Sequence, residues 1–294
     1  MADPDSTPVS LAPAPDGREI AYVDGGDPDG FAVIGLHGTP GCRFSRWPDD
    51  DVYARTGVRY VTTDRAGYGR SSRHRARTVA SEVTDVLAVA DHLGLERFSV
   101  VGSTGGGPHA LACAALLPGL VVRVACLSSL APVGPGGMQR RDWSAGLPSG
   151  GAELQWAAEG EIRVLRERQK QQETMTAALT ADPESVRGDA VTAGDREFLG
   201  RPDVAERFAL IVREQALQGV AGAVDDTFAL ARPWGFNLSS IAAPTMLSHR
   251  PEDGVPVTHT RWLAARIGGA ETSYDAVGGS EDEIATTMRW LAGR

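Results

Sequence analysis

The chain has 294 residues, of which 42% are hydrophobic and 23% charged, and its formal net charge is −9. A chain of this length can bury one large core plus an inserted lid, so a second domain of a different type is not needed. The acidic balance argues against nucleic-acid binding, and no apolar stretch approaches membrane-spanning length. We therefore expect a cytoplasmic protein that acts on a small molecule.

The first 15 residues contain four prolines and lack a basic start. No long apolar segment follows them, so residues 1–15 are predicted to be a flexible leader rather than a secretory signal. The three cysteines, Cys42, Cys113 and Cys126, cannot all pair, and we expect free thiols. The sequence holds no metal-ligand cluster and no phosphate-binding loop beyond a glycine-rich turn discussed below, so no cofactor is expected.

Strand and helix patterns alternate along the first half of the chain. Apolar runs predict strands at residues 18–23, 31–36, 58–63, 98–101 and 121–127. Apolar residues at helical spacing predict helices at residues 78–93 and 107–117, the second with Pro108 in its first turn. This alternation predicts an α/β fold with a doubly wound, mostly parallel sheet.

The composition changes after residue 134. A charged, glutamine-rich helix is predicted over residues 152–179, and further helical pieces extend to about residue 230. The strand pattern then resumes at residues 243–249 and 270–274, before a last helix at 284–291. We therefore expect a core formed by residues 16–134 and 233–294, with residues 135–232 inserted as a helical cap.

The segment Gly102-Ser103-Thr104-Gly105-Gly106 joins a predicted strand to a predicted helix. It has the form of a GxSxG nucleophile elbow, in which the central residue sits in a strained turn and presents its hydroxyl above the sheet. Thr104 occupies the place of the usual serine, although a β-branched residue is a poor choice for positive φ. The alternative centre is Ser103, which would put Val101 in place of the first glycine; we favour Thr104.

Two further loops follow predicted strands: His37-Gly38-Thr39-Pro40-Gly41, and Asp64-Arg65-Ala66-Gly67-Tyr68-Gly69-Arg70-Ser71. Together with the elbow they resemble the α/β-hydrolase superfamily, specifically its cap-bearing proline iminopeptidase-like and epoxide hydrolase-like members. The resemblance covers nearly the whole chain after residue 15. It implies an oxyanion hole formed by the backbone N–H groups of Thr39 and Gly105. Because backbone N–H groups do not depend on the identity of the side chain, we expect this oxyanion hole to be present even where the triad is altered.

The resemblance also implies an acid and then a histidine late in the chain. Asp253 stands in the acid's place, but Ser280 stands where the family usually has histidine, and no histidine follows His259. A hydroxyl without a base is a poor nucleophile, and deleting a triad histidine costs about a millionfold in turnover. The sequence therefore indicates a degenerate triad and disfavours ordinary ester or amide hydrolysis.

Each late residue also has a structural interpretation. Ser280 and Glu283 form a capping box ahead of the last helix, so Ser280 serves either as a helix cap or as a catalytic residue. Asp253 is either a loop carboxylate or a proton acceptor. Glu281 and Asp282 suit the positive end of that helix and are secondary candidates for a base.

Four histidines precede or adjoin these motifs: His37, His109, His249 and His259. They stand at positions where relatives with an intact triad often carry histidine too, so we interpret them as structural. His37 borders the expected pocket, so it is the best placed of them to act as a surrogate base, and it is also a candidate for contact with the substrate.

Three tryptophans have two interpretations. Trp143, Trp156 and Trp234 either pack the core or face the pocket, where flat apolar surface suits an aromatic or polycyclic ligand. Taken as pocket residues, they would bind the substrate together with His37.

The expected oxyanion hole and the missing triad histidine together lead to a functional hypothesis. The catalytic candidates are Thr104, Asp253 and Ser280, with Thr39 and Gly105 as the oxyanion hole. The leading hypothesis is a cofactor-independent, non-hydrolytic enzyme of specialised metabolism, such as a cyclase or lyase, that stabilises an oxyanion in a hydrophobic molecule. The alternatives are a catalytically silent small-molecule binder and a residual hydrolase that uses Thr104.

Overall fold

The computed structural model describes residues 9–181, 201–249, 254–274 and 280–294. Eight strands form one sheet in the order β1-β2-β4-β3-β5-β6-β7-β8. Their bounds are β1 Ser10–Pro13, β2 Glu19–Gly26, β3 Phe31–Leu36, β4 Val58–Thr63, β5 Phe98–Ser103, β6 Val121–Leu127, β7 Thr245–Ser248 and β8 Glu271–Ser273. Strands β1 and β2 pair antiparallel at one edge, and β3 to β8 are parallel. The expected mostly parallel α/β sheet is confirmed.

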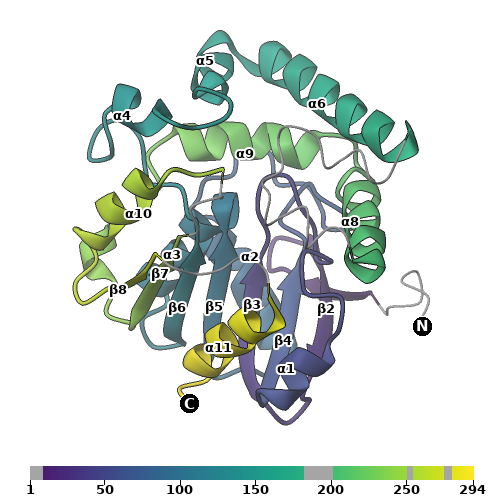
Figure 1. Cartoon of the computed structure of the whole chain (residues 1–294), viewed down its shortest axis with the longest axis vertical. Helices are drawn as coiled ribbons and strands as arrows, with labels where there is room; N and C mark the ends of the chain where they lie inside the picture. The colour runs from purple at the N-terminus through teal and green to yellow at the C-terminus, as the bar shows by residue number, and fades with distance from the viewer. Residues whose placement is uncertain (1–8, 182–200, 250–253, 275–279) are drawn as a thin grey trace.

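Helices surround this sheet on both faces and across one end (Figure 1). Their bounds are α1 Asp51–Arg55, α2 Glu82–His92, α3 Gly107–Leu116, α4 Arg140–Ser144, α5 Ala152–Glu159, α6 Glu161–Ala181, α8 Pro202–Gln215, α9 Ala221–Ala231, α10 Val257–Ala264 and α11 Glu281–Leu291. Two short 3₁₀ turns are η2 Thr104–Gly106 and η4 Leu238–Ser240. In chain order, α4 to α9 lie between β6 and β7.

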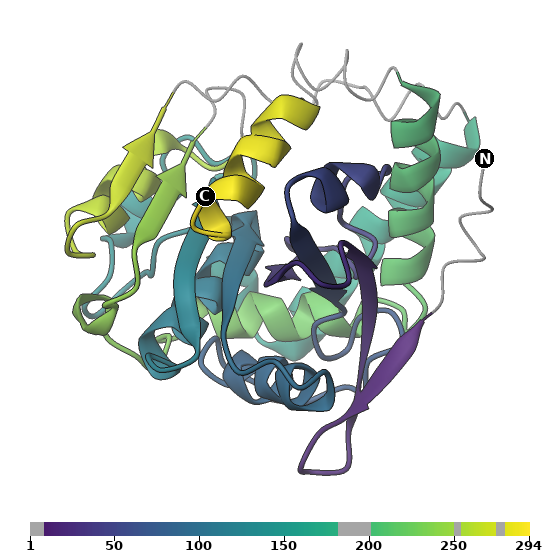
Figure 2. The ribbon, with the colours of Figure 1, turned by 90° about the horizontal axis from the view of Figure 1, so that it is seen from below.

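Successive side chains of a strand point to opposite faces of the sheet, so the core has two layers. Ile34 and Val100 pack with the buried residues of α2, α3 and α10 on one face. Their neighbours Val33 and Val101 pack with α1 and α11 on the other face. Figure 2 shows α1 and α11 on one side of the sheet, and α2 and α3 on the opposite side. Strands buried on both faces need continuous apolar runs, which explains why these runs were strong predictors of strands.

The helices between β6 and β7 are tied to loops at the carboxyl ends of the strands. Arg43, in the loop after β3, pairs with Asp64 and with Glu214 of α8, at 2.6 Å in each case. The Gly222 N–H of α9 donates to the Gly67 carbonyl at 3.0 Å. Figure 1 shows α4, α5, α6 and α9 lying across this end of the sheet. These helices therefore stand in the position of a cap over the loops that follow the strands.

Two sequence expectations need correction. The predicted leader ended at residue 15, but Ser10–Pro13 form strand β1, paired with β2, and Ala12 within it is fully buried; residues 1–8 lie outside the described part. The single helix expected over residues 152–179 is divided into α5 and α6 at Gly160, whose φ of +105° cannot continue a helix.

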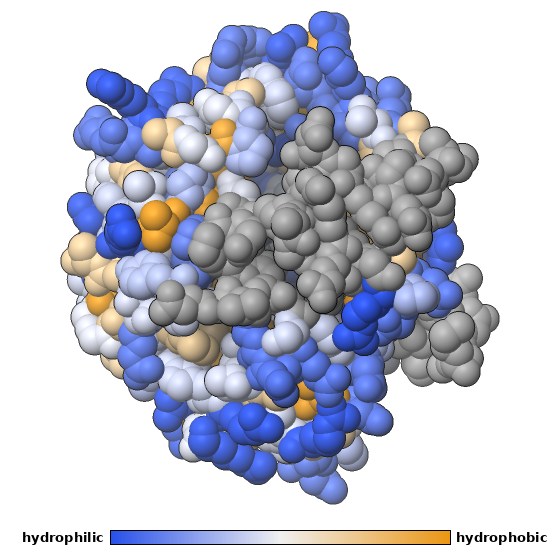
Figure 3. All heavy atoms as spheres, viewed as in Figure 1, coloured by the Kyte–Doolittle hydropathy of each residue, from blue (hydrophilic) through white to orange (hydrophobic). Residues whose placement is uncertain are grey.

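The cysteines and the surface agree with the remaining expectations. Cys42, Cys113 and Cys126 are buried and unpaired. Among the described helices, none combines the length and apolar character needed to cross a bilayer. On the face shown in Figure 3, hydrophobic residues appear as small separate patches among hydrophilic ones.

Candidate active site

The turn between β5 and α3 has the geometry of a nucleophile elbow. Thr104 has a φ of +46°, whereas Ser103 is extended with a φ of −106°. Thr104 is therefore the residue at the apex, as the glycine spacing predicted. A β-branched residue in this conformation costs about 1 to 3 kcal/mol, and such strain is concentrated at functional sites. A Cβ on Gly106 would lie 2.5 Å from the His37 carbonyl oxygen, so only glycine fits there.

The loop after β3 lies directly against this elbow. A Cβ added to Gly105 would lie 3.2 Å from the backbone nitrogen of Thr39, and one added to Gly38 would collide with the Thr104 hydroxyl. Within the described part of the chain, the Thr39 N–H has no hydrogen-bond acceptor. Thr39, Gly105 and Thr104 are thus brought together, although of the three only Thr104 is among the residues that line the cavity described below.

A buried carboxylate from α9 holds this loop in place. The Thr39 hydroxyl donates to Asp226 Oδ2 at 2.6 Å. Arg65, which also binds Asp226, donates to the carbonyl oxygens of His37 at 2.8 Å and Gly38 at 3.0 Å. Asp226 of α9 therefore helps to fix the conformation of the loop after β3, although it lies 187 residues later in the chain than Thr39.

Asp226 is the centre of a cluster of buried charges. Arg65 and Arg77 each approach it to 2.6 Å, and the Tyr68 hydroxyl donates to it at 2.7 Å. Although burial by itself raises the pKa of the Asp226 carboxyl, the charges of Arg65 and Arg77 outweigh it and hold that pKa well below its usual value. The carboxylate is therefore ionised at neutral pH and compensates two buried cations.

Glu82 is a second acid at the margin of this cluster. It is buried, and its Oε2 has no hydrogen-bond partner within the described residues. Burial, reinforced by the charge of Asp85, raises its pKa to about 7. Since the folded pKa exceeds the unfolded one, the contribution of Glu82 to stability is fully present below pH 4.5 and declines as the pH rises through 7.

Replacing Glu82 by glutamine is expected to remove this pH dependence. At pH 8 the Glu82→Gln variant should be more stable than the parent protein by about 1 to 3 kcal/mol, because it avoids burying an unpaired charge. At pH 4, below the pKa of the unfolded carboxyl, the two proteins should unfold at nearly the same urea concentration. Urea titrations at both pH values test this, and a variant less stable than the parent at pH 8 contradicts it.

The buried histidines have structural roles. His37 Nδ1 donates to the Gly38 carbonyl at 2.7 Å and Nε2 accepts from the Arg65 N–H at 3.0 Å, so both ring nitrogens are used. His259 likewise accepts from the Ala131 N–H and bonds the Trp143 carbonyl. Burial lowers the pKa of both imidazoles. These rings are neutral and engaged, which confirms the structural interpretation; the substrate contact expected of His37 is not supported.

A cavity of about 340 Å³ opens above Thr104. Its lining comes from the carboxyl ends of β5, β6 and β7, the loop after β3, and the helices α8 and α11. The lining residues are Ser45, Arg46, Trp47, Ser103, Thr104, Leu127, Ser128, Ile211, Ser248, Glu283, Ile284, Thr287 and Met288. Within this described lining there is no histidine, and Glu283 is the only carboxylate. Most of the remaining surface is apolar or carries a hydroxyl, as small-molecule sites commonly do.

Among the lining residues that sequence reasoning missed, Ser128 and Glu283 bear most on the chemistry. Ser128 directly follows β6 and has a φ of +49°, so two neighbouring strands end in strained hydroxyl-bearing residues. Its N–H donates to the Ser248 carbonyl at 2.8 Å. Ser128 belongs to no motif, and its place after a parallel strand was the only available signal. Glu283 was assigned only to the capping box, although one helical face can carry both a cap and a pocket side chain.

The other predicted catalytic residues are not brought to Thr104. Ser280 is exposed at the start of α11, where its hydroxyl accepts from the Glu283 N–H at 3.2 Å, so the helix-cap interpretation is confirmed. It is absent from the described cavity lining. Asp253 lies outside the described residues, and its role stays a prediction.

The three tryptophans expected to bind substrate also lie elsewhere. Trp143 is buried, and its indole N–H donates to the Ala131 carbonyl at 2.7 Å. Trp156 belongs to α5, and the guanidinium of Arg168 on α6 lies 5.7 Å from the centroid of its ring. Trp234 lines a different cavity. Trp143 and Trp234 belong to the buried core, in agreement with the core-packing interpretation of those two rings, and none of the three tryptophans is in the described lining of the Thr104 cavity.

Comparison with known proteins identifies the family. A family model described as "alpha/beta hydrolase fold" matches residues 32–179, which is half of the chain. The chain belongs to the α/β-hydrolase family. The elbow at Thr104 and the strand order of this α/β hydrolase agree with that assignment.

Curated relatives and solved structures of other α/β hydrolases agree with it. Epoxide hydrolase B of Mycobacterium tuberculosis is 38% identical over 107 residues, covering 35% of this chain and 30% of that protein. Proline iminopeptidase of Xanthomonas citri is 36% identical over 108 residues, covering 34% and 33%. The matches thus span about a third of the length of these relatives. The enol-lactonase of Burkholderia xenovorans LB400 has the same fold, with a TM-score of 0.68, 18% identity and coverage of 98% and 100%.

Proposed function

We propose that this α/β hydrolase is a cofactor-independent, non-hydrolytic enzyme that stabilises an oxyanion while a bond forms or breaks in a hydrophobic small molecule. One observation carries the proposal: the described lining of the Thr104 cavity contains a carboxylate, Glu283, and no imidazole. Carboxylates are effective proton acceptors for carbon acids, whereas hydroxyl attack on an ester needs an adjacent base such as histidine. Cyclisation, Michael-type addition and elimination belong to the proposed class, in specialised metabolism.

A few polar groups at the elbow and on α11 carry out this proposed chemistry. The Glu283 carboxylate accepts a proton from carbon next to a substrate carbonyl, and the resulting enolate oxygen binds the N–H groups of Thr39 and Gly105. The Thr104 hydroxyl donates a third hydrogen bond to that oxygen. After the bond is made or broken, Glu283 returns the proton. Asp253 is the alternative proton acceptor in this proposal.

The substrate body is assigned to the apolar walls of the cavity. Trp47, Ile211, Ile284 and Met288 offer apolar surface above the hydroxyls of Thr104 and Ser128. A molecule with carbonyl or phenol oxygens at one end and an apolar, aromatic or polycyclic body at the other fits this division. The volume of about 340 Å³ is near the lower end of ordinary ligand pockets.

A second candidate is hydrolysis with Thr104 as the nucleophile. The similarity to an epoxide hydrolase and to a proline iminopeptidase favours it. It requires a base for the Thr104 hydroxyl, and the described cavity lining supplies Glu283 rather than histidine.

Replacing Thr104 by serine separates these candidates. The Thr104→Ser variant and the parent protein are both expected to hydrolyse p-nitrophenyl esters at nearly the uncatalysed rate, since an absent triad base costs about a millionfold. A fluorophosphonate probe, checked against an intact serine hydrolase, should leave residue 104 unlabelled in both. Mass-spectrometric detection of the probe on Thr104 of the parent protein would instead establish the hydrolase.

The substrate is identified by deleting the gene in its source organism. We expect a hydrophobic metabolite to accumulate, and the purified protein should convert that metabolite without added cofactor. An unchanged metabolite profile contradicts an enzymatic role. Tight binding of the metabolite without conversion supports a silent binder instead.

A further inference from the structure

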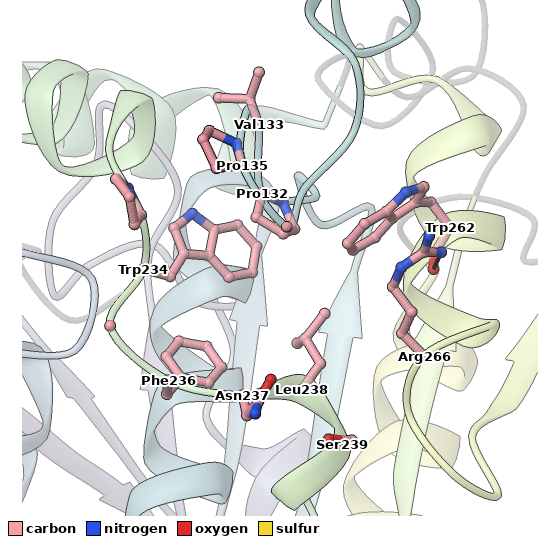
Figure 4. A pocket seen from close by; sticks show the side chains of 13 residues that line it. Pro132, Val133, Pro135, Trp234, Phe236, Asn237, Leu238, Ser239, Trp262 and Arg266 are labelled. Carbon is pink, nitrogen blue, oxygen red and sulfur yellow. Dashed lines mark hydrogen bonds between the residues drawn. The ribbon is translucent and has the colours of Figure 1, made fainter.

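A second cavity, of about 540 Å³, lies where the chain crosses between the sheet and the cap (Figure 4). It is formed by the outgoing segment after β6, the returning segment after α9, and α10. The lining residues are Pro132, Val133, Pro135, Gly136, Pro233, Trp234, Gly235, Phe236, Asn237, Leu238, Ser239, Trp262 and Arg266. None of these residues lines the cavity above Thr104.

Aromatic rings form two opposing walls of this second cavity. Trp234 and Phe236 stack on one side, with ring centroids 5.9 Å apart and planes inclined by 25°. Figure 4 shows Trp262 and Arg266 on the opposite side, with Leu238 between the two walls. Aromatic rings on both sides of a cavity offer apolar surface to an aromatic ligand.

The cavity adjoins another of about 380 Å³. The two share Val133, Pro135 and Pro233, and the second extends the aromatic surface to Phe228 of α9. The pair of neighbouring cavities, which we call the crossover site, therefore has room for an extended molecule.

Three arginines line the crossover site: Arg140, Arg232 and Arg266. The Arg266 guanidinium lies 3.6 Å from the Trp262 ring centroid, and that of Arg232 lies 5.3 Å from the Phe228 ring. Within the described part of the chain, none of the three makes a salt bridge, although this protein has 38 acidic and 29 basic residues. Arginines stacked on rings with no carboxylate partner suit a ligand that is both aromatic and anionic.

We propose that the crossover site binds an aromatic or polycyclic small molecule that carries a carboxylate, sulfonate or similar anionic group. The rings of Trp234, Phe236 and Trp262 contact its aromatic body, and Arg266 at the rim binds its anionic group. Because its lining shares no residue with the Thr104 cavity, this binding does not depend on the chemistry proposed there.

Two fluorescent probes with the same ring system test the proposal. 1-Anilinonaphthalene-8-sulfonate is anionic, and N-phenyl-1-naphthylamine is its uncharged parent. The Arg266→Gln variant is expected to weaken the Kd of the sulfonate by about tenfold, the value of a charge-assisted contact of about 1.4 kcal/mol, and to leave the Kd of the neutral probe within about twofold. The Trp262→Leu variant should weaken the binding of both probes.

Two control variants make the test specific. Arg261 lies next to Trp262 on α10, with its guanidinium 5.9 Å from the Tyr274 ring, and Arg261→Gln should leave both Kd values within about twofold. Ile284→Trp fills the Thr104 cavity and should also leave them unchanged. If Arg266→Gln behaves like Arg261→Gln, or if Ile284→Trp abolishes probe binding, the proposal is overturned. Thermal unfolding of each variant verifies that it is folded.

Discussion

Replacing Asp226 by asparagine is expected to lower the free energy of unfolding by about 3 to 5 kcal/mol. The substitution preserves shape but leaves Arg65 and Arg77 without the carboxylate that compensates their charges at 2.6 Å. All three side chains are at most 1% exposed, so solvent cannot replace the lost partner. Urea denaturation at pH 7, followed by tryptophan fluorescence, measures the effect.

The neighbouring Asp225 supplies a matched control. It lies on the same helix and pairs with Arg73, whose side chain is 24% exposed, so water screens the interaction. Asp225→Asn should therefore cost no more than about 1 kcal/mol. Equal losses in the two variants would show that α9 is sensitive to any charge removal and would contradict a special role for Asp226.

The same carboxylate predicts a dependence on acid. Because its pKa is held well below the usual value in the folded protein, its contribution to stability is fully present above about pH 4, where the unfolded carboxyl is also ionised. That contribution is lost as the pH falls through the depressed folded value. The parent protein should thus lose stability below about pH 4 more steeply than Asp226→Asn.

Replacing Glu283 by glutamine is expected to lower the turnover of the accumulated metabolite by about 10²- to 10⁴-fold, the usual contribution of a general base. Glutamine fills the same space but cannot accept the proton. Since Glu283 belongs to the Thr104 cavity, the loss should fall on kcat more than on KM. Steady-state rates with the purified variant provide the measurement.

Glu281 is the matched control for this experiment. It lies two residues earlier on α11 and pairs with Arg55, and its side chain is 42% exposed. Glu281→Gln should retain kcat within about twofold, because exposed ion pairs contribute little. If the Glu283→Gln variant keeps full activity, proton abstraction belongs to another group, and Asp253 becomes the residue to replace.

The sequence predicted the sheet and the elbow well. Strands β3, β4 and β6 begin and end where the apolar runs do, because strands buried on both faces leave an unbroken signal. Thr104 was placed at the apex by the glycines around it, since steric crowding at Gly106 excludes every other residue. Both predictions depend only on residues that are close together in the sequence.

The rest depended on contacts between distant segments. Asp226 accepts a hydrogen bond from the hydroxyl of Thr39, which lies 187 positions earlier in the chain, and nothing near Asp226 in the sequence indicates that partnership. Trp143 and Trp234 are equally apolar in sequence, yet one packs on His259 and the other lines the crossover site. Strand β1 is four residues long and contains a proline, so its pairing with β2 gave no usable pattern.

The attachment of α9 to the core also restricts how a substrate reaches Thr104. If helices α4 to α9 moved away as a rigid body, α9 would take Asp226 with it. The buried guanidinium groups of Arg65 and Arg77 would then lack the carboxylate that compensates their charges. We therefore expect α9 to remain seated during turnover. A substrate should instead reach the elbow while α9 stays in place, through the cavity that Ile211 of α8 and Ile284 of α11 help to line.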